Sequence, residues 1–195
     1  MNNKNKAEIS RETKETQIKL SLETESKNPG LAGSSGVGFF DHMLNTFAIH
    51  GGFNIQLSMT GDTHVDCHHT IEDVGIVLGG AFRNIIDMRT HAANITRFGT
   101  AAVPMDEALA SCTVDLGGRA YLVFNADFKS AIIGGYDTQM TREFFAALAQ
   151  NIRANIHLNL LYGENDHHKT EAIYKAAARA VRQALIPSDG IMSAK

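Results

Sequence analysis

The sequence is poor in the residues that mark secreted, membrane-bound and nucleic-acid-binding proteins. It has two cysteines, three prolines and no tryptophan in 195 residues, and its net charge is -3 with neutral histidines. Cys67 and Cys112 lack the spacing of a metal-binding pair. One disulfide is possible, but free thiols in a cytoplasmic protein are the simpler interpretation. The lack of a basic excess argues against nucleic acid as a partner.

Long apolar segments are also absent. No segment approaches the roughly 18 uninterrupted apolar residues that a transmembrane helix requires, so we expect no membrane contact. The polar residues 1–15 lack the apolar centre of a signal peptide. Hydrophobic residues make up 44% of the chain and charged residues 20%, which is typical of a globular protein of one domain or of two small halves.

Histidine is the residue type in unusual excess, with nine copies. Four of them belong to a motif that occurs twice, His68-His69-x-x-Glu72 and His167-His168-x-x-Glu171, 99 residues apart. In both halves a phenylalanine pair, an alternating segment and the motif follow in the same order, which indicates an internal duplication rather than chance similarity. We predict a disordered tail over 1–10, a first half over 11–92, a second half over 93–186 and a flexible tail over 187–195.

Hydrophobic periodicity predicts an α+β fold in which each half packs an antiparallel sheet on two helices. Alternating residues favour strands over 16–24, 53–59, 111–116, 119–127 and 156–160. We interpret the strands at 111–116 and 119–127 as a hairpin that turns at Gly117-Gly118. Helical spacing and terminal signals favour helices over 39–49, 66–88, 138–154 and 167–185. A loop or hairpin is predicted over 27–38, and a connector over 89–101.

Each motif lies at the start of a predicted helix, where residues three or four apart share a face. Each glutamate is therefore near both histidines of its motif. Adjacent histidines diverge by about 100° around a helix, so one ring can bind one metal while its neighbour binds a second. Imidazole nitrogen and carboxylate oxygen suit manganese, iron or zinc. The doubled motif thus predicts a two-metal site.

Other polar residues are candidates for the same site. The alternation of its strand places His157 opposite the apolar residues, which suits a ligand and a solvent-exposed histidine equally. Single histidines such as His64 and His91 are more often surface or capping residues, and we leave both outside the site. The two cysteines are interpreted as bystanders. The additional candidates are Asp41, His42, His50, Asp106, Glu107 and His157.

Three cations stand apart from other basic residues: Arg97, Arg119 and Lys175. Lys175 follows His167 by eight residues, about two helical turns, so it lies close to the face of the motif. Such donors suit an anionic substrate group, most plausibly a phosphate. For any one of the three alone, an ordinary surface salt bridge is the simpler interpretation.

Several segments in chain order carry a resemblance to a known family. They are TKET (13–16), FFDHML (39–44), DCHHTIED (66–73), RFG (97–99), MDEAL (105–109), DLGGR (115–119), YDTQ (136–139) and ENDHHKTEAIYKAAARA (164–180). The sequence resembles the imidazoleglycerol-phosphate dehydratases from about residue 8 to residue 190. The paired motifs together with FDHML are highly specific to that family.

The resemblance implies an activity, a cofactor and an assembly. Members convert D-erythro-imidazole glycerol phosphate to imidazole acetol phosphate in histidine biosynthesis. They use manganese, and they form shells of 24 subunits built from trimers. The implied fold is an internally duplicated unit, each half a four-stranded sheet packed on two helices (ribosomal protein S5 domain 2-like). The two metals lie between subunits, so metal binding and assembly are expected to be coupled.

The resemblance also assigns roles to residues. Glu15 of TKET matches the catalytic carboxylate. The implied ligands of one metal are His42, His69, His167 and Glu171, and those of the other are His68, Glu72, His157 and His168. The implied phosphate contacts are Arg97, Arg119, Lys175 and Ser188. The substrate-binding set that we predict is Glu15, His42, His50, His68, Glu72, Arg97, Arg119, His167, Lys175 and Ser188.

The mechanism that we predict proceeds through a dimanganese-bound imidazolate. The hydroxyl next to the ring then leaves to give a diazafulvene-like intermediate, and loss of a carbon-bound proton gives an enol that becomes the ketone. Glu15 is predicted to carry the proton, with Glu171, Asp106 or a water assisting.

The sequence departs from the family at its C-terminus. It has Pro187-Ser188-Asp189-Gly190 where members usually have Pro-Ser-x-Lys-Gly, so a lysine is missing. Either another group replaces that phosphate contact or the substrate binds more weakly. Two other functions remain open: a metal-dependent hydrolase of a phosphorylated substrate, and a non-catalytic metal-dependent shell protein.

Overall fold

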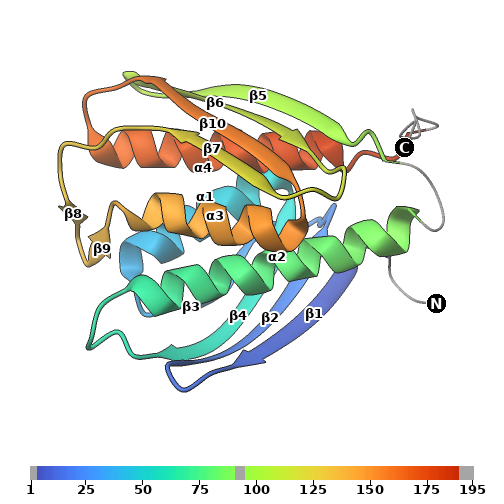
Figure 1. Cartoon of the computed structure of the whole chain (residues 1–195), viewed down its shortest axis with the longest axis horizontal. Helices are drawn as coiled ribbons and strands as arrows, with labels where there is room; N and C mark the ends of the chain where they lie inside the picture. The colour runs from blue at the N-terminus through green and yellow to red at the C-terminus, as the bar shows by residue number, and fades with distance from the viewer. Residues whose placement is uncertain (1–3, 91–94, 189–195) are drawn as a thin grey trace.

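The computed structural model describes residues 4–90 and 95–188, which form two four-stranded sheets with four helices between them and one short two-stranded sheet (Figure 1). The first half contains β1 (Lys6–Glu12), β2 (Thr16–Thr24), β3 (Gly30–Ser34), α1 (Gly38–Gly51), β4 (Phe53–Gly61) and α2 (His68–Thr90). The second contains β5 (Phe98–Met105), β6 (Ala108–Asp115), β7 (Tyr121–Asn125), β8 (Ile132–Ile133), β9 (Tyr136–Asp137), α3 (Met140–Ile152), β10 (Asn155–Tyr162) and α4 (Asp166–Ala184).

The two halves share one topology. Their strand orders are β1-β2-β4-β3 and β5-β6-β10-β7. In each sheet the last pair is parallel and the other pairs are antiparallel. Apart from the short β8–β9 hairpin, the order of strands and helices is the same in both halves. The predicted α+β fold, with four strands and two helices in each half, is therefore confirmed.

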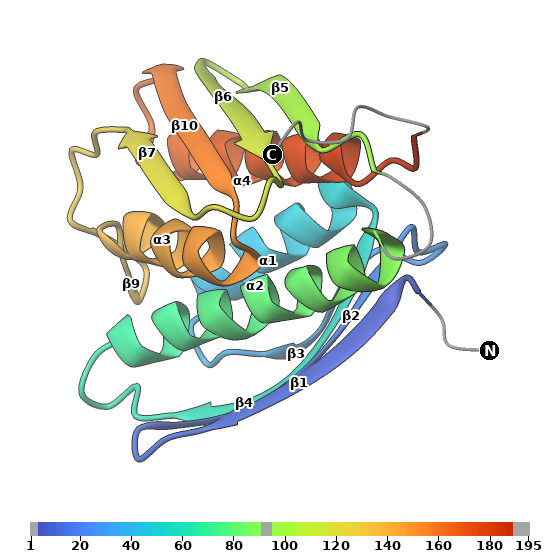
Figure 2. The same cartoon turned by 45° about the vertical axis from the view of Figure 1, so that its right-hand side comes forward.

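The sheets form the outer layers and the helices the inner ones (Figures 1 and 2). Helix α2 packs on β1 and β2, and α4 packs on β5 and β6. Across the halves, α2 contacts α3 and α1 contacts α4. Buried aromatic side chains from all four helices fill the centre: Phe40, Phe47, Phe82, Phe144, Phe145 and Tyr174. The halves are thus joined mainly through their helices.

Two glycines set the spacing between α2 and α3. A Cβ at Gly75 would lie 2.8 Å from the main-chain oxygen of Phe144, and one at Gly79 would lie 2.8 Å from that of Leu148. A side chain at either position would push the helices apart, because packed backbone cannot move independently. The close contact between the halves therefore depends on small residues four apart on α2.

The prediction of a disordered tail over 1–10 is wrong from Lys6 onward. β1 pairs antiparallel with β2 from Lys6 opposite Glu23 to Glu12 opposite Gln17. Only Ala7 on this strand is buried. Because an edge strand tolerates charged side chains, its composition does not show the alternation of a half-buried strand. Residues 1–3 lie outside the part that the structure describes.

The predicted hairpin between 111–116 and 119–127 is also wrong. β6 and β7 are not neighbours, because β10 lies between them and pairs parallel with β7. The hairpin partner of β6 is β5, which begins inside the segment predicted as a connector and continues beyond it to Met105. Gly117-Gly118 was a correct turn signal, but a local signal does not determine which strand a chain joins after it turns.

The segment 27–38 contains β3, which pairs parallel with β4. At Gly33 the φ angle is +104°, and a Cβ would lie 1.8 Å from the main-chain oxygen of Leu57. Only glycine allows the two strands to approach here. At the C-terminus, Pro187 forms an isolated bridge with Ile95. The predicted boundary of the halves at 92–93, and the tail over 189–195, lie outside the described residues.

Candidate metal centre

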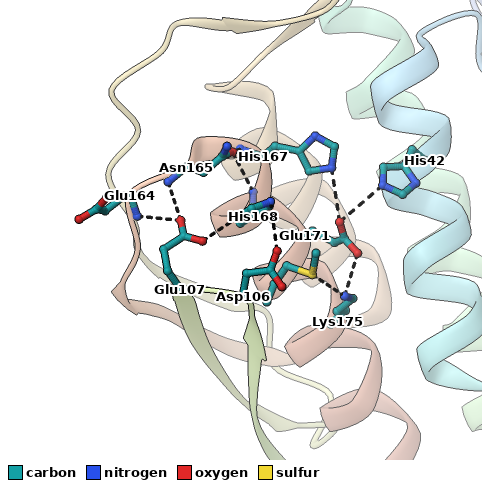
Figure 3. A network of polar contacts seen from close by, with 10 residues as sticks. His42, Asp106, Glu107, Glu164, Asn165, His167, His168, Glu171 and Lys175 are labelled. Carbon is teal, nitrogen blue, oxygen red and sulfur yellow. Dashed lines mark hydrogen bonds and ion pairs between the residues drawn. The ribbon is translucent and has the colours of Figure 1, made fainter.

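Three predicted ligands converge where α1 meets α4. The Nε2 atoms of His42 and His167 lie 3.5 and 3.4 Å from Oε2 of Glu171. All three ligand atoms lie within 4.8 Å of one another, and the two imidazole ring centroids are 5.4 Å apart. Figure 3 shows both rings turned toward this carboxylate. Two imidazole nitrogens and one carboxylate oxygen fit a divalent transition metal such as manganese, with positions left for other ligands.

Glu171 is held in its ionised form. Burial of its carboxylate alone would raise its pKa, but the hydrogen bond and charge of Lys175, with the two histidines, lower the pKa below its usual range. Lys175 Nζ lies 2.8 Å from Oε1, the oxygen that faces away from the histidines. It also lies 3.0 Å from Sδ of Met105. The carboxylate therefore offers one oxygen to a metal while a lysine holds the other.

The start of α4 explains why these side chains converge. Asn165 caps the helix, and its side-chain oxygen accepts hydrogen bonds from the main-chain N–H groups of His167 and His168 at 2.9 and 3.4 Å. The motif therefore occupies the first turns, with His167 and Glu171 four residues apart on one face. Phe39 of α1 packs edge-on against His167, with ring centroids 5.0 Å apart.

His168 faces away from this cluster toward the β5–β6 turn (Figure 3). Its Nδ1 lies 2.7 Å from Oε2 of Glu107, and its Nε2 lies 3.6 Å from Asp106. Hydrogen bonds lower the pKa of Glu107 to about 2. The largest effect comes from main-chain N–H groups, chiefly that of Asn165, and the ring of His168 adds to it. In turn, the hydrogen bond to Glu107 raises the pKa of His168. The structure thus separates the two histidines of this motif, as the two-metal prediction requires.

The first motif has the same arrangement at the start of α2. Asp66 accepts a hydrogen bond from the main-chain N–H of His68 at 2.7 Å. Nε2 of His68 lies 3.6 Å from Oε2 of Glu72. Nδ1 of His69 lies 3.0 and 3.2 Å from the two carboxylate oxygens of Asp62, and this hydrogen bond is the main cause that raises the pKa of His69. Asp62 was not among the predicted site residues.

One chain does not assemble either predicted ligand set in full. Within residues 4–90 and 95–188, the only three donors that converge are His42, His167 and Glu171. His69, the fourth member of that set, lies instead beside Asp62. In the other set, His68 and Glu72 are neighbours on α2, while His168 lies on α4 and His157 on the exposed face of β10.

Comparison with known proteins decides the family. The model of the family described as imidazoleglycerol-phosphate dehydratase matches residues 35–181. The chain belongs to this family. It is 49% identical to the imidazoleglycerol-phosphate dehydratase of Streptococcus mutans over 179 residues, which is 92% of this chain and 90% of that protein. It is 50% identical to the Geobacter sulfurreducens enzyme over 193 residues, 97% of each chain.

Solved dehydratase structures share the fold. The Staphylococcus aureus enzyme superposes with a TM-score of 0.82 at 36% identity, covering 94% of this chain and 99% of that one. The Pyrococcus furiosus enzyme in complex with (S)-C348 gives a TM-score of 0.79 at 34% identity, covering 95% and 98%. The protein is accordingly a hydro-lyase of histidine biosynthesis that acts on a small molecule, from a metal-dependent family.

Glu15, the carboxylate assigned by resemblance, lies in the β1–β2 turn of the dehydratase fold. Thr13 organises this turn, since its hydroxyl accepts the N–H of Glu15 at 3.1 Å and that of Thr16 at 2.9 Å. The Thr16 hydroxyl donates to buried Asp73 on α2 at 2.5 Å. The Glu15 side chain is exposed, and its charge contributes to the raised pKa of His69. The turn therefore places Glu15 beside the first motif of the dehydratase.

The predicted phosphate contacts are spread over the dehydratase chain. Lys175 lies beside Glu171. Arg97 is bound to Asp115 at 2.6 and 3.1 Å, an ion pair that raises its pKa. Its main-chain N–H donates to Ala184 at the end of α4, which is about 25 Å along the helix from His167 at roughly 1.5 Å per residue. Arg119 and Ser188 also lie away from the motif, after β6 and after α4.

The other candidates in the dehydratase have varied surroundings. Burial, with the charges of Lys175 and Arg179, lowers the pKa of His50. Asp41 accepts hydrogen bonds from Ser34 at 2.6 Å and from the Ser35 N–H at 2.7 Å, which ties β3 to α1. His64 is exposed, and His91 lies outside the described residues. Both cysteines are buried free thiols. No helix in the described ranges is long and apolar enough to cross a membrane.

Proposed function

We propose that this dehydratase converts D-erythro-imidazole glycerol phosphate to imidazole acetol phosphate at a site that holds two Mn²⁺ ions. The observation that carries the proposal is the convergence of His42, His167 and Glu171 from two helices on one point. In each motif the two adjacent histidines face different partners, which supplies the reason for a second ion. The imidazole nitrogens and carboxylate oxygens of the two motifs are donors that manganese accepts.

The ligands divide between the two ions by the direction of each side chain. His42, His167 and Glu171 share one ion, and the adjacency of His68 and Glu72 favours their sharing of the other. When bound, the two ions supply Lewis acidity that stabilises the substrate's imidazole ring in its deprotonated form. The burial of Glu171 is outweighed by Lys175 and the two histidines, which favour its ionised form, so its pKa is lowered. We propose His69 as the fourth ligand of the first ion, and His157 and His168 as the remaining ligands of the second.

Proton transfer is assigned to Glu15. Once the substrate ring is deprotonated, the hydroxyl on the carbon next to the ring leaves, and its departure gives a diazafulvene-like intermediate. The carboxylate then removes the neighbouring carbon-bound proton to give an enol, so that the elements of water are lost, and the enol becomes the ketone. The exposed position of Glu15 in a well-ordered turn suits a group that must reach substrate. Asp106 assists, whereas Glu171 is better suited to a ligand because Lys175 occupies its second oxygen.

Complete sites require neighbouring subunits. The main chain of Arg97 lies about 25 Å along α4 from His167, too far for one small phosphorylated substrate to contact both residues in one chain. A second copy can supply Arg97, Arg119 and Ser188 to the phosphate, while Lys175 lies beside the metal. We propose a shell of 24 subunits built from trimers in the cytoplasm, where the two free thiols are stable.

The test is product analysis with purified protein, substrate and Mn²⁺. We expect imidazole acetol phosphate with no release of inorganic phosphate, and loss of this activity after complete removal of metal. Release of inorganic phosphate would instead show a hydrolase that uses the same ligands. Metal binding and assembly without turnover would show a non-catalytic shell protein. Either outcome contradicts the proposal.

A further inference from the structure

The second histidine of each motif carries a carboxylate partner on the same ring nitrogen. Nδ1 of His69 lies 3.0 Å from Oδ2 of Asp62, and Nδ1 of His168 lies 2.7 Å from Oε2 of Glu107. These two contacts occur in the two halves independently, at sequence-equivalent histidines. The first histidines behave differently, because the Nε2 atoms of His68 and His167 face the glutamates of their own motifs.

An ionised carboxylate only accepts hydrogen bonds, so the Nδ1 atom of each ring must carry a proton. The neutral ring then has its free lone pair on Nε2, the atom on the opposite side. In His168 this atom points toward the space beside Asp106, which lies 3.6 Å away. We propose that Asp62 and Glu107 are positioning carboxylates that fix His69 and His168 in the orientation and tautomer that bind metal through Nε2. This inference rests on the proposed metal-dependent function.

Both carboxylates are themselves fixed. Glu107 accepts hydrogen bonds from the main-chain N–H groups of Glu164 and Asn165, at 3.1 and 2.7 Å, as well as from His168. These groups lie in the loop that leads into α4, so Glu107 joins the β5–β6 turn to the start of the motif. Asp62 donates its main-chain N–H to the carbonyl of Glu15 at 3.1 Å. Its side chain is only 17% exposed.

The two halves use different loops for the same task. Glu107 directly precedes Ala108, the first residue of β6. The equivalent residue of the first half is Glu15, which directly precedes Thr16, the first residue of β2. The partner of His69 is nevertheless Asp62, which follows β4. In the second half, the carboxylate in the hairpin turn, Glu107, therefore orients a histidine. In the first half, the equivalent carboxylate, Glu15, is left free for substrate.

The first test measures Mn²⁺ affinity on the assembled protein, from the electron paramagnetic resonance signal of unbound Mn²⁺ at equilibrium. Replacing either carboxylate by alanine (Asp62→Ala or Glu107→Ala) is expected to weaken binding by about 10- to 100-fold. Glu107→Gln keeps an oxygen that can accept the Nδ1 proton, so it should recover part of the loss. Glu164→Gln is the matched control, because that side chain points away from the cluster (Figure 3) and should leave the affinity unchanged.

The outcomes separate this inference from the proposed function. If the unaltered protein binds no Mn²⁺, the proposed function fails. If it binds Mn²⁺ and the alanine variants bind equally well, the proposed function stands and the positioning role is overturned. Circular dichroism and particle size of the metal-free variants report folding. If an alanine variant is misfolded, the isosteric Asp62→Asn and Glu107→Gln variants decide, and affinities as strong as the control's would overturn the inference.

A second measurement tests the division of roles between Glu15 and Asp62. Glu15→Gln should lower kcat and leave Mn²⁺ affinity unchanged, because its carboxylate does not hold a ligand. Asp62→Asn should weaken Mn²⁺ binding, and part of its activity should return at high Mn²⁺ concentration. If Glu15→Gln weakens Mn²⁺ binding as strongly as Asp62→Ala, the hairpin carboxylate also positions the metal site, and the inferred division is wrong.

Discussion

At the residue scale, the carboxylate of Glu171 contacts three side chains at once. One carboxylate oxygen faces two histidines, and the other is held by Lys175 at 2.8 Å. Lys175 is also a proposed contact of the substrate phosphate. Under the proposed function, Glu171 therefore couples metal binding to phosphate binding.

Glu15 gives the most direct prediction for catalysis. Glu15→Gln removes a proton carrier but keeps the size of the side chain, so kcat should fall by about 10²- to 10⁴-fold. Glu12→Gln is the control, because Glu12 is an exposed carboxylate at the end of β1 in the same hairpin. Steady-state rates of product formation with saturating Mn²⁺ measure both. Normal turnover in a folded Glu15→Gln variant would remove this residue from the mechanism.

His50 predicts a dependence of stability on pH. Burial and the charges of Lys175 and Arg179 lower its pKa, so the folded state binds fewer protons than the unfolded state. The contribution of His50 to the free energy of unfolding is complete above the pKa of the unfolded state, about 6.5. It is lost as the pH falls through the pKa of the folded state.

The variant His50→Gln lacks this titration. Its melting temperature in metal-free protein should therefore fall less between pH 7 and pH 5 than that of the unaltered chain, by a few degrees at most. Calorimetry at constant ionic strength measures the difference. An equal or larger fall in the variant would show that this histidine is not held in its neutral form.

The sequence predicted the local part of the site better than the tertiary part. Helical periodicity alone correctly placed His167 and Glu171 on one face, since the first turns of a helix depend on neighbours in sequence. His42 was only a candidate from the residues, because its approach to α4 depends on how two helices pack. Asp62 was missed, because an aspartate after a glycine is an ordinary turn residue.

At the element scale, the start of α4 depends on a buried ion pair. Nζ of Lys169 lies 2.7 Å from Asp166, and the two side chains are 4% and 5% exposed. Asp166 also accepts the N–H of Ser130 at 2.6 Å, and Lys169 donates to the carbonyl of Asp127 at 3.2 Å. The pair therefore fixes the segment after β7 against the first turn of the motif helix.

Loss of one partner should be costly. Lys169→Met leaves the carboxylate of Asp166 buried without its counter-ion, and we expect the free energy of unfolding to fall by about 3 to 5 kcal/mol. Lys129→Met, an exposed lysine on the same segment, should change it by less than about 0.5 kcal/mol. Urea denaturation of both variants measures this. Equal stabilities would contradict a structural role for the pair.

Elements were predictable where periodicity was strong. The four helices and the inner strands β2, β4, β6 and β10 have a buried face that the sequence shows as regular alternation or helical spacing. Apart from the short β8–β9 hairpin, the strands that were missed or paired wrongly are the outer strands of the two four-stranded sheets: β1, β3, β5 and β7. Edge strands bury less surface and need fewer apolar residues, so their pairing depends on the whole fold.

At the scale of the whole molecule, the duplicated fold gives each chain two copies of the histidine motif. Each half presents a motif at the start of a helix that lies between two sheets. The sequence predicted this duplication from repeated order alone. Which ligands share an ion could not be predicted from it, because His68, His157 and His168 lie on different elements of one chain. Under the proposed function, contacts between chains bring them together.

Removal of metal should therefore affect assembly as well as turnover. With chelator we expect activity to disappear and the melting temperature to fall. Restoring Mn²⁺ at 100 times its dissociation constant should return about 2.7 kcal/mol of stability per site. Calorimetry together with light scattering measures both effects. A chelated protein with unchanged stability and size would show that metal and assembly are independent.

A titration of metal-free protein with Mn²⁺, following bound metal and product formation in the same samples, tests the two-metal site most directly. The account predicts no turnover without metal and a rate that reaches its plateau at two bound Mn²⁺ ions per chain. Sustained product formation in fully metal-free protein, or a plateau at one ion per chain, would contradict it.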